Sequence, residues 1–247
     1  MTKFAHDEVV PNKDSLLSKK EQVAGMFDNI AVRYDFLNRF LSAGIDISWR
    51  KKAIHQLKEI NPKQILDVAT GTADVAIMMT KILDADKITG IDISNGMLDI
   101  GRQKINKLDL KNKIELLNGD SEAINFNDNS FDAVTVSFGV RNFQNLEKGL
   151  AEIKRVLKPG GKLVILEFSH PKLPIIKTIY QLYMSIITPG IGKLFSKNKD
   201  AYQYLDESIK KFPDGKQFIE VLNKTGYQNS YSKTLSLGIC SIYCGKK

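Results

Sequence analysis

The chain has 247 residues, of which 43% are hydrophobic and 26% charged, which is typical of an ordinary globular protein with one large domain. No segment reaches the roughly 18 apolar residues of a membrane span, and the polar N-terminus lacks the apolar core of a secretory signal, so we expect a cytoplasmic protein. The net charge of +8 leaves nucleic acid, an anionic membrane and an acidic substrate open as partners.

The first part of the chain is predicted to be helical and the rest to alternate between strands and helices. Apolar side chains recur at helical spacing over residues 16–60, and Pro62 ends this region. We interpret residues 1–60 as an N-terminal helical cap of the same domain, and 61–247 as its main part. Strands are predicted at 65–68, 87–91, 114–117, 131–136 and 162–168, and helices at 74–84, 95–108 and 145–157. This alternation predicts an α/β fold with a doubly wound, Rossmann-like and mostly parallel sheet, in which Lys158–Gly161 turn from a helix into the next strand.

An insert at about 170–212 interrupts the alternation. The stretch from Phe168 to Lys199, which includes most of this insert, has no Asp or Glu. It has lysines at 172, 177, 193, 197 and 199 among apolar and aromatic residues. Such a segment suits a surface that lies against anionic lipid headgroups. The alternative is a core helix whose lysines reach the solvent at its edges.

The C-terminal part is predicted to end in an antiparallel hairpin, with a helix at about 214–224 and strands at 229–236 and 239–244. Cys240 and Cys244 would share one face of the last strand about 13 Å apart, which is too far for a disulfide. We therefore expect two buried thiols. No further ligands follow at a suitable spacing, so we expect no metal site.

Two segments of the first strand–helix–strand unit point to a nucleoside-containing cofactor. The first strand runs into the turn Ala69–Ala73, and the second strand ends on Asp92. The carboxyl ends of parallel strands share one edge of the sheet, which is where ligands bind in this fold class. Gly71 would let the backbone approach the ligand, and Asp92 can accept both hydroxyl protons of a ribose.

The single glycine of the turn favours S-adenosylmethionine over a dinucleotide, whose fingerprint needs three glycines. Thr72 and the turn backbone could bind the amino-acid end of S-adenosylmethionine. Asp120, followed by Ser121, could accept the adenine amino group, and Ser137 adds a polar position at the end of the fourth strand. The alternatives are that Asp92, Asp120 and Ser121 cap helices and that Thr72 is a turn residue.

Several motifs resemble the class I S-adenosylmethionine-dependent methyltransferases, namely LDVATGTAD, GIDIS, LNGDSEAI, NSFDAVTVSFG and RVLKPGGKLVILEF. More narrowly, residues 34–49, 137–142, 155–169 and 202–214 are similar to the C-methyltransferase family of menaquinone and ubiquinone biosynthesis, of the demethylmenaquinone methyltransferase type. The resemblance covers about residues 20–245. One departure is Ala73, where members often have Gly.

The resemblance implies C-methylation of the ring of a polyprenyl quinol, with S-adenosylmethionine as the donor. Demethylmenaquinol is the expected substrate. A benzoquinol precursor of ubiquinone and another lipophilic small molecule are the alternatives. The insert would then let the protein dock transiently on the inner face of the membrane.

Methyl transfer to a ring carbon needs alignment and an electron-rich acceptor rather than an array of acids and bases. Arg141, in the loop after the fourth strand, could stabilise a phenolate, or it could be an ordinary loop charge or salt-bridge partner. His170 could act as a base but lies outside the motifs. Tyr34, Asp35 and Asn38 could contact the substrate or pack between helices.

Other enzyme classes fit less well. Enzymes that methylate amino groups of nucleic acid usually have an Asn/Asp-Pro-Pro-Tyr-like motif where this chain has SFGVRNF. Enzymes that methylate cytosine C5 need a nucleophilic cysteine beside the site, and both cysteines of this chain lie at its far C-terminus. We therefore expect no nucleic-acid partner. A cofactor-binding subunit without activity remains open.

Overall fold

The computed structural model describes residues 4–171 and 199–247. Two helices, α1 (Lys19–Leu41) and α2 (Ile45–His55), precede the sheet, as the sequence predicts. A capping box starts α1: Ser18 Oγ accepts from the Glu21 amide at 3.3 Å, and the Glu21 carboxylate accepts from the Ser18 amide at 2.8 Å. Gly44, with φ of 77°, allows the sharp turn between the two helices.

Seven strands form one sheet in the order β3-β2-β1-β4-β5-β7-β6. The strands are β1 (Gln64–Val68), β2 (Lys87–Asp92), β3 (Ile114–Asn118), β4 (Phe131–Ser137), β5 (Leu157–Phe168), β6 (Gln228–Leu235) and β7 (Cys240–Lys246). β1 to β5 pair in parallel, and β7 pairs antiparallel with both β5 and β6. The predicted mostly parallel sheet with a C-terminal antiparallel hairpin is confirmed.

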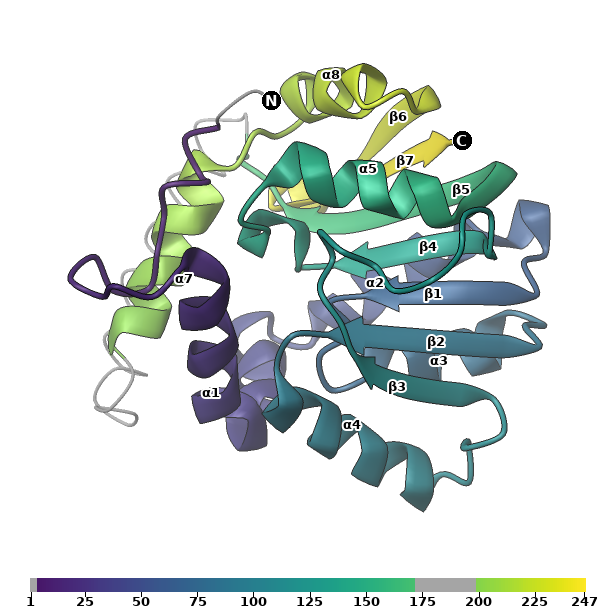
Figure 1. Ribbon diagram of the computed structural model, residues 1–247, viewed down its shortest axis with the longest axis horizontal. Coiled ribbons are helices and arrows are strands. Elements are labelled where there is room, and N and C mark those ends of the chain that lie inside the picture. The colour runs from purple at the N-terminus through teal and green to yellow at the C-terminus, as the bar shows by residue number, and fades with distance from the viewer. Residues whose placement is uncertain (1–3, 172–198) are drawn as a thin grey trace.

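Helices cover both faces of the sheet. Those after β1 are α3 (Asp74–Ile82), α4 (Asn95–Lys107), α5 (Leu146–Val156), α7 (Lys199–Lys211) and α8 (Lys216–Lys224). Side chains of α2, α3 and α4 share one hydrophobic core, and those of α5 and α8 share the other. Neighbouring residues of β1 point to opposite faces, since Ile65 belongs to the first core and Leu66 to the second. In Figure 1, α5 crosses the front of the sheet while α2 and α3 lie behind it.

The boundary between α5 and β5 differs from the prediction. α5 ends at Val156, but β5 already begins at Leu157, five residues before the predicted start at 162. Phe131 pairs with Leu157 and Ala133 with Lys162, so the residues between form a bulge inside the strand. The Pro-Gly-Gly sequence indicates irregular backbone, but only the pairing with β4 decides that this backbone belongs to the sheet.

The predicted insert is described only in part. Residues 172–198, which contain most of its lysines, lie outside the described residues, and residues 199–211 form α7. Of the described helices, none is long and apolar enough to cross a membrane. Cys240 and Cys244 are buried free thiols in β7, as predicted.

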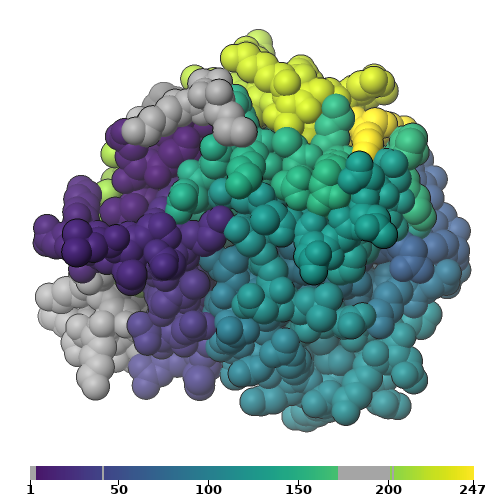
Figure 2. Space-filling model, in the orientation of Figure 1, coloured from purple at the N-terminus to yellow at the C-terminus, as the bar shows by residue number. Residues whose placement is uncertain are grey.

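The N-terminal segment and α1 lie beside the carboxyl ends of the strands (Figure 1). In Figure 2 this segment forms the purple part of the visible surface, next to the teal part from the middle of the chain. The cap therefore covers the edge of the sheet where a ligand is expected.

Candidate active site

Two adjoining pockets lie at the carboxyl edge of the sheet. The first, called here the sheet-edge pocket, lies where β1, β2, β3 and β4 end. It brings together five of the six predicted cofactor residues, Gly71, Asp92, Asp120, Ser121 and Ser137. The second, called the apolar pocket, lies between the cap, the sheet and α7. Phe27, Tyr34 and Phe138 line both pockets, so these side chains form the boundary between them.

The turn after β1 has an unusual backbone. Ala69, Gly71 and Ala73 all have positive φ, at 54°, 57° and 64°. An alanine in this region costs energy that glycine does not, and such strain is often found at functional sites. A Cβ added at Gly71 would meet only Tyr34 Cε1 at 4.0 Å, so this part of the turn is open towards the pocket.

Asp92 lies at the end of β2 and helps to hold the turn. Its carboxylate accepts from the Gly71 amide at 2.8 Å and from the Ser94 amide at 2.9 Å. Burial raises the pKa of Asp92, and these hydrogen bonds partly offset that shift. Each oxygen keeps a lone pair, so the carboxylate can still accept the two hydroxyl protons of a ribose. This donor and acceptor set fits the nucleoside part of S-adenosylmethionine.

Asp120 is shared with the cap. Its carboxylate accepts from Lys20 Nζ of α1 and from the Glu122 amide at 2.9 Å. Lys20 also pairs with Glu122 at 3.5 Å, and both side chains line the sheet-edge pocket. The adenine amino group would therefore have to share Asp120 with Lys20, a contact that the sequence did not predict.

Thr72 is buried and does not line either pocket. Its hydroxyl donates to Asp35 Oδ1 at 2.6 Å and accepts from Lys104 Nζ at 3.0 Å. These bonds join the turn to α1 and α4. The structure thus places the Thr72 side chain where a turn residue would be, and Asp35 packs with it rather than facing the apolar pocket.

The apolar pocket is built from aromatic side chains that lie far apart in the sequence. Its wall combines Tyr34 of α1, Trp49 of α2, Phe138 after β4, Phe168 of β5 and Tyr204 of α7. The rings of Phe138 and Phe168 lie 4.7 Å apart, and Trp49 lies 6.4 Å from Phe138 and 6.5 Å from Phe168. Apart from Tyr34, none of these residues was predicted from the sequence as a site residue. All of them lie in the four stretches that resemble the C-methyltransferase family, and this resemblance was the one feature of the sequence that could have pointed to them.

Arg141 lies in this wall and is almost fully buried. Its guanidinium donates to Glu167 Oε1 at 2.9 Å and to the Phe138 carbonyl at 2.5 Å. Burial raises the pKa of Glu167, and the neighbouring Arg141 opposes that rise. Within the described part of the chain, the buried Nε atoms of Arg141 and of Arg50, another wall residue, have no hydrogen-bond partner. Arg141 is therefore a buried salt-bridge partner of Glu167 whose Nε donor has no partner among the described residues.

Of the two remaining candidates, Asn38 and His170, one lines a pocket and the other does not. Asn38 lines the apolar pocket together with Tyr34. His170 lines neither pocket, is 44% exposed, and has its Nδ1 at 3.1 Å from the Asp214 carboxylate. This position gives no support to a role for His170 as a base.

Comparison with known proteins identifies relatives over nearly the whole chain. The model of the ubiE/COQ5 methyltransferase family matches residues 15–247. A demethylmenaquinone methyltransferase of Bacteroides fragilis is 48% identical, over 93% of this chain and 94% of the relative. A ubiquinone/menaquinone biosynthesis C-methyltransferase of Geotalea daltonii is 45% identical, over 94% of this chain and 99% of the relative.

Solved structures share the fold at much lower identity. A putative S-adenosyl-L-methionine-dependent methyltransferase of Methanococcus maripaludis has a TM-score of 0.61 and 20% identity, over 88% of this chain and 92% of that one. A possible histamine N-methyltransferase of Thermotoga maritima has a TM-score of 0.61 and 18% identity, over 90% and 99%. These structures support the fold, and the family match carries the activity: the chain belongs to the ubiE/COQ5 methyltransferase family and is an S-adenosylmethionine-dependent C-methyltransferase.

Proposed function

We propose that this protein methylates a ring carbon of a polyprenyl quinol, with demethylmenaquinol as substrate and menaquinol as product. Membership of the ubiE/COQ5 methyltransferase family is the observation that carries the proposal. Relatives named demethylmenaquinone methyltransferase are 41–48% identical to this chain. The aromatic pocket beside the sheet-edge pocket adds support, because a ring with a prenyl tail needs a largely apolar site next to the methyl donor.

In the proposed complex, the sheet-edge pocket holds the donor. Asp92 accepts the ribose hydroxyls, and the backbone near Gly71 gives the close approach that the nucleoside needs. Asp120, Ser121 and Ser137 supply polar groups for the rest of the molecule. When bound, S-adenosylmethionine supplies an electrophilic methyl group on a sulfonium.

The quinol ring would lie against the Tyr34–Phe138 boundary, with its carbon facing the sheet-edge pocket. The ring carbon forms a bond to the methyl carbon as the sulfur–methyl bond breaks, and the ring then loses its hydrogen as a proton to water. Ionisation of a ring hydroxyl makes that carbon nucleophilic. Arg141, with an unused Nε in the wall, stabilises the phenolate, while Glu167 and the Phe138 carbonyl fix its guanidinium.

The prenyl tail of such a substrate lies in a lipid bilayer. We therefore include transient contact with the membrane surface in the proposed function, since the enzyme must reach a ring that is anchored in lipid. The lysine-rich insert suggested this contact from the sequence, but most of that segment lies outside the described residues.

A methylation assay tests the function directly. The protein is incubated with labelled S-adenosylmethionine and short-chain demethylmenaquinol, with the corresponding benzoquinol precursor of ubiquinone in parallel. We expect transfer of one methyl group to the naphthoquinol ring, seen by mass spectrometry as a product one methyl heavier. Turnover of the benzoquinol alone would shift the assignment to ubiquinone synthesis. Tight binding of S-adenosylmethionine without turnover of either quinol would overturn the proposal.

A further inference from the structure

The cap exposes an apolar surface that the active site does not use. Along α1, Val32, Phe36 and Phe40 are spaced four residues apart and therefore lie along one side of the helix. They are 86%, 59% and 47% exposed, and the rings of Phe36 and Phe40 are stacked at 6.0 Å. Ile45 and Ile47 of α2 are 47% and 37% exposed. These five residues are called the α1–α2 ridge.

The ridge backs directly onto the apolar pocket. Phe27, Ile30, Tyr34, Leu37 and Asn38 of the same helix line that pocket. One helix thus presents one side to the site of the ring and another side to the solvent. A lipid surface at the ridge would lie within a helix diameter, roughly 10 Å, of the pocket wall.

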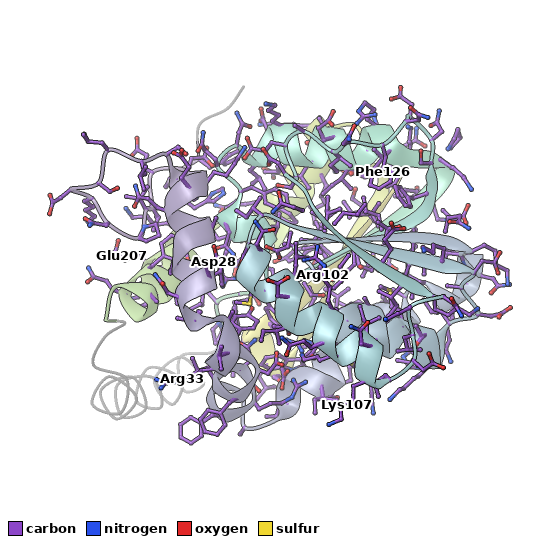
Figure 3. The ribbon with its side chains drawn as sticks, turned by 60° about the horizontal axis from the view of Figure 1, so that its bottom comes forward. Asp28, Arg33, Arg102, Lys107, Phe126 and Glu207 are labelled. Atoms are coloured by element: carbon purple, nitrogen blue, oxygen red, sulfur yellow. The ribbon has the colours of Figure 1, made fainter. Side chains whose placement is uncertain are left out.

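The exposed charged side chains in the segment that carries the ridge are all basic. Between Ile30 and Ala53 the exposed charged residues are Arg33, Lys51 and Lys52. In Figure 3, Arg33 projects from α1 away from the sheet. Of the two acids of this segment, Asp46 is buried and pairs with Arg39, and Asp35, which is 34% exposed, is neutralised by its ion pair with Lys104.

We propose that the α1–α2 ridge is the surface by which the protein docks on an anionic lipid bilayer. Exposed aromatic and branched side chains enter the boundary between headgroups and acyl chains, and the surrounding basic residues attract anionic headgroups. The absence of an exposed acid in this segment favours an anionic lipid surface over a neutral or basic partner. The inference rests on the proposed function for the reason to dock, but the docking itself can be measured without turnover.

The main test is vesicle binding by the double variant Phe36→Ser/Phe40→Ser. Vesicles of phosphatidylcholine and phosphatidylglycerol, and of phosphatidylcholine alone, are sedimented with the protein at low salt. We expect the wild type to bind the anionic vesicles and the double variant to bind them at least about tenfold more weakly, because two aromatic rings no longer leave water. Leu108→Ser is the matched control, because Leu108 is 48% exposed at the end of α4. Figure 3 places its neighbour Lys107 far from Arg33.

A second variant tests the charge separately. Lys51→Gln/Lys52→Gln should remove most of the preference for anionic over neutral vesicles, with little change in thermal stability because both side chains are exposed. This variant keeps the inference testable even if the loss of both phenylalanines disturbs folding.

Turnover separates this inference from the proposed function. The Phe36→Ser/Phe40→Ser variant should lose activity on long-chain demethylmenaquinol in vesicles but keep the affinity for S-adenosylmethionine and the turnover of a short-chain quinol in solution. Failure of the wild type to methylate either quinol would refute the proposed function and leave the vesicle result to be judged alone. The docking inference is overturned if the wild type does not bind anionic vesicles, if the phenylalanine and the lysine variants both bind them as the wild type does, or if sedimentation shows that these variants only dissociate a dimer.

Discussion

The two pockets at the carboxyl edge of the sheet are built in different ways. The sheet-edge pocket combines apolar side chains with polar ones such as Asp92, Asp120 and Ser121. Its polar residues follow the carboxyl ends of strands that come one after another along the chain. The apolar pocket is aromatic, and its wall joins Tyr34, Trp49, Phe138, Phe168 and Tyr204 from five separate elements. The methyl donor, which many enzymes of this fold share, would bind at turns that the sheet itself brings together. The methyl acceptor, which differs between enzymes, would need a wall of side chains assembled around that sheet.

Because the two pockets are built from different elements, we expect that a substitution in one pocket does not affect binding of the ligand in the other. Variants of the sheet-edge pocket should change the affinity for S-adenosylmethionine, and variants of the apolar pocket should change the turnover or the KM of the quinol.

The largest effect is expected at Asp92. Asp92→Ala should raise the Kd for S-adenosylmethionine by about 100-fold or more, because it removes the proposed acceptor of both ribose hydroxyls and the bond to the Gly71 amide. Isothermal titration measures this change. Asp99→Ala is the control, since Asp99 is an exposed acid of α4 that pairs with Arg102. A Kd within about threefold of the wild type would remove Asp92 from the cofactor site.

Asp67, a buried residue of β1, should make the stability of the fold depend on pH. It is buried, and burial raises its pKa to about 6 despite hydrogen bonds from Thr70 and Thr135. The native state therefore binds a proton that the unfolded state, with a pKa near 3.8, does not hold between about pH 4 and 6. Stability from this group should rise by about 3 kcal/mol as the pH falls through that window. Urea unfolding at pH 8 and pH 5 should show about 1.4 kcal/mol of this gain in the wild type but not in Asp67→Asn, since pH 5 lies only part of the way through the window. Equal pH dependence in both proteins would contradict it.

Arg141 tests the apolar pocket. Arg141→Lys should lower kcat by about 10- to 100-fold, because a lysine cannot hold Glu167 and also present a second donor to the phenolate. The KM of the quinol and the Kd of S-adenosylmethionine should change little. Steady-state kinetics with Arg102→Lys as the control checks this. An unchanged kcat would reduce Arg141 to a structural ion pair.

A smaller effect is expected where α7 meets the site. The Tyr204 hydroxyl donates to Asn142 Oδ1 at 3.0 Å, which fastens α7 to the loop that carries Arg141. Tyr204→Phe should raise the KM of the quinol about fivefold, equivalent to one hydrogen bond, without changing the binding of S-adenosylmethionine. Tyr227→Phe loses a comparable bond to the Leu150 carbonyl outside both pockets, so it should leave KM alone. Weaker cofactor binding by Tyr204→Phe would show that the pockets are coupled.

The smallest effect is expected at Ala73. Ala73→Gly removes the cost of a φ of 64° for alanine but adds the backbone entropy of glycine, so the net gain should be about 0.5–1 kcal/mol. Thermal unfolding should show a Tm about 2 °C higher. Ala24→Gly, inside α1, should lower the Tm instead. A lower Tm for both would mean that packing of the Ala73 methyl outweighs the strain.

The sheet, the cap and most of the sheet-edge pocket could be predicted from the amino-acid sequence. The strand pattern predicts which segments end at the same edge, so Gly71, Asp92, Asp120, Ser121 and Ser137 could be grouped without coordinates. Thr72 shows the limit of this reasoning, because its position in the turn was clear but the direction of its hydroxyl depends on Asp35 and Lys104.

The apolar pocket and the surroundings of the charged residues depend on long-range packing and could not be predicted from the sequence. Spacing along the chain does not indicate that Trp49 and Phe168 meet, or that Lys20 reaches Asp120 across the sheet edge. Such contacts depend on how α1, α2 and α7 pack against the finished sheet. Periodic patterns reflect the geometry of single strands and helices, whereas a pocket wall depends on side chains that only long-range packing brings together.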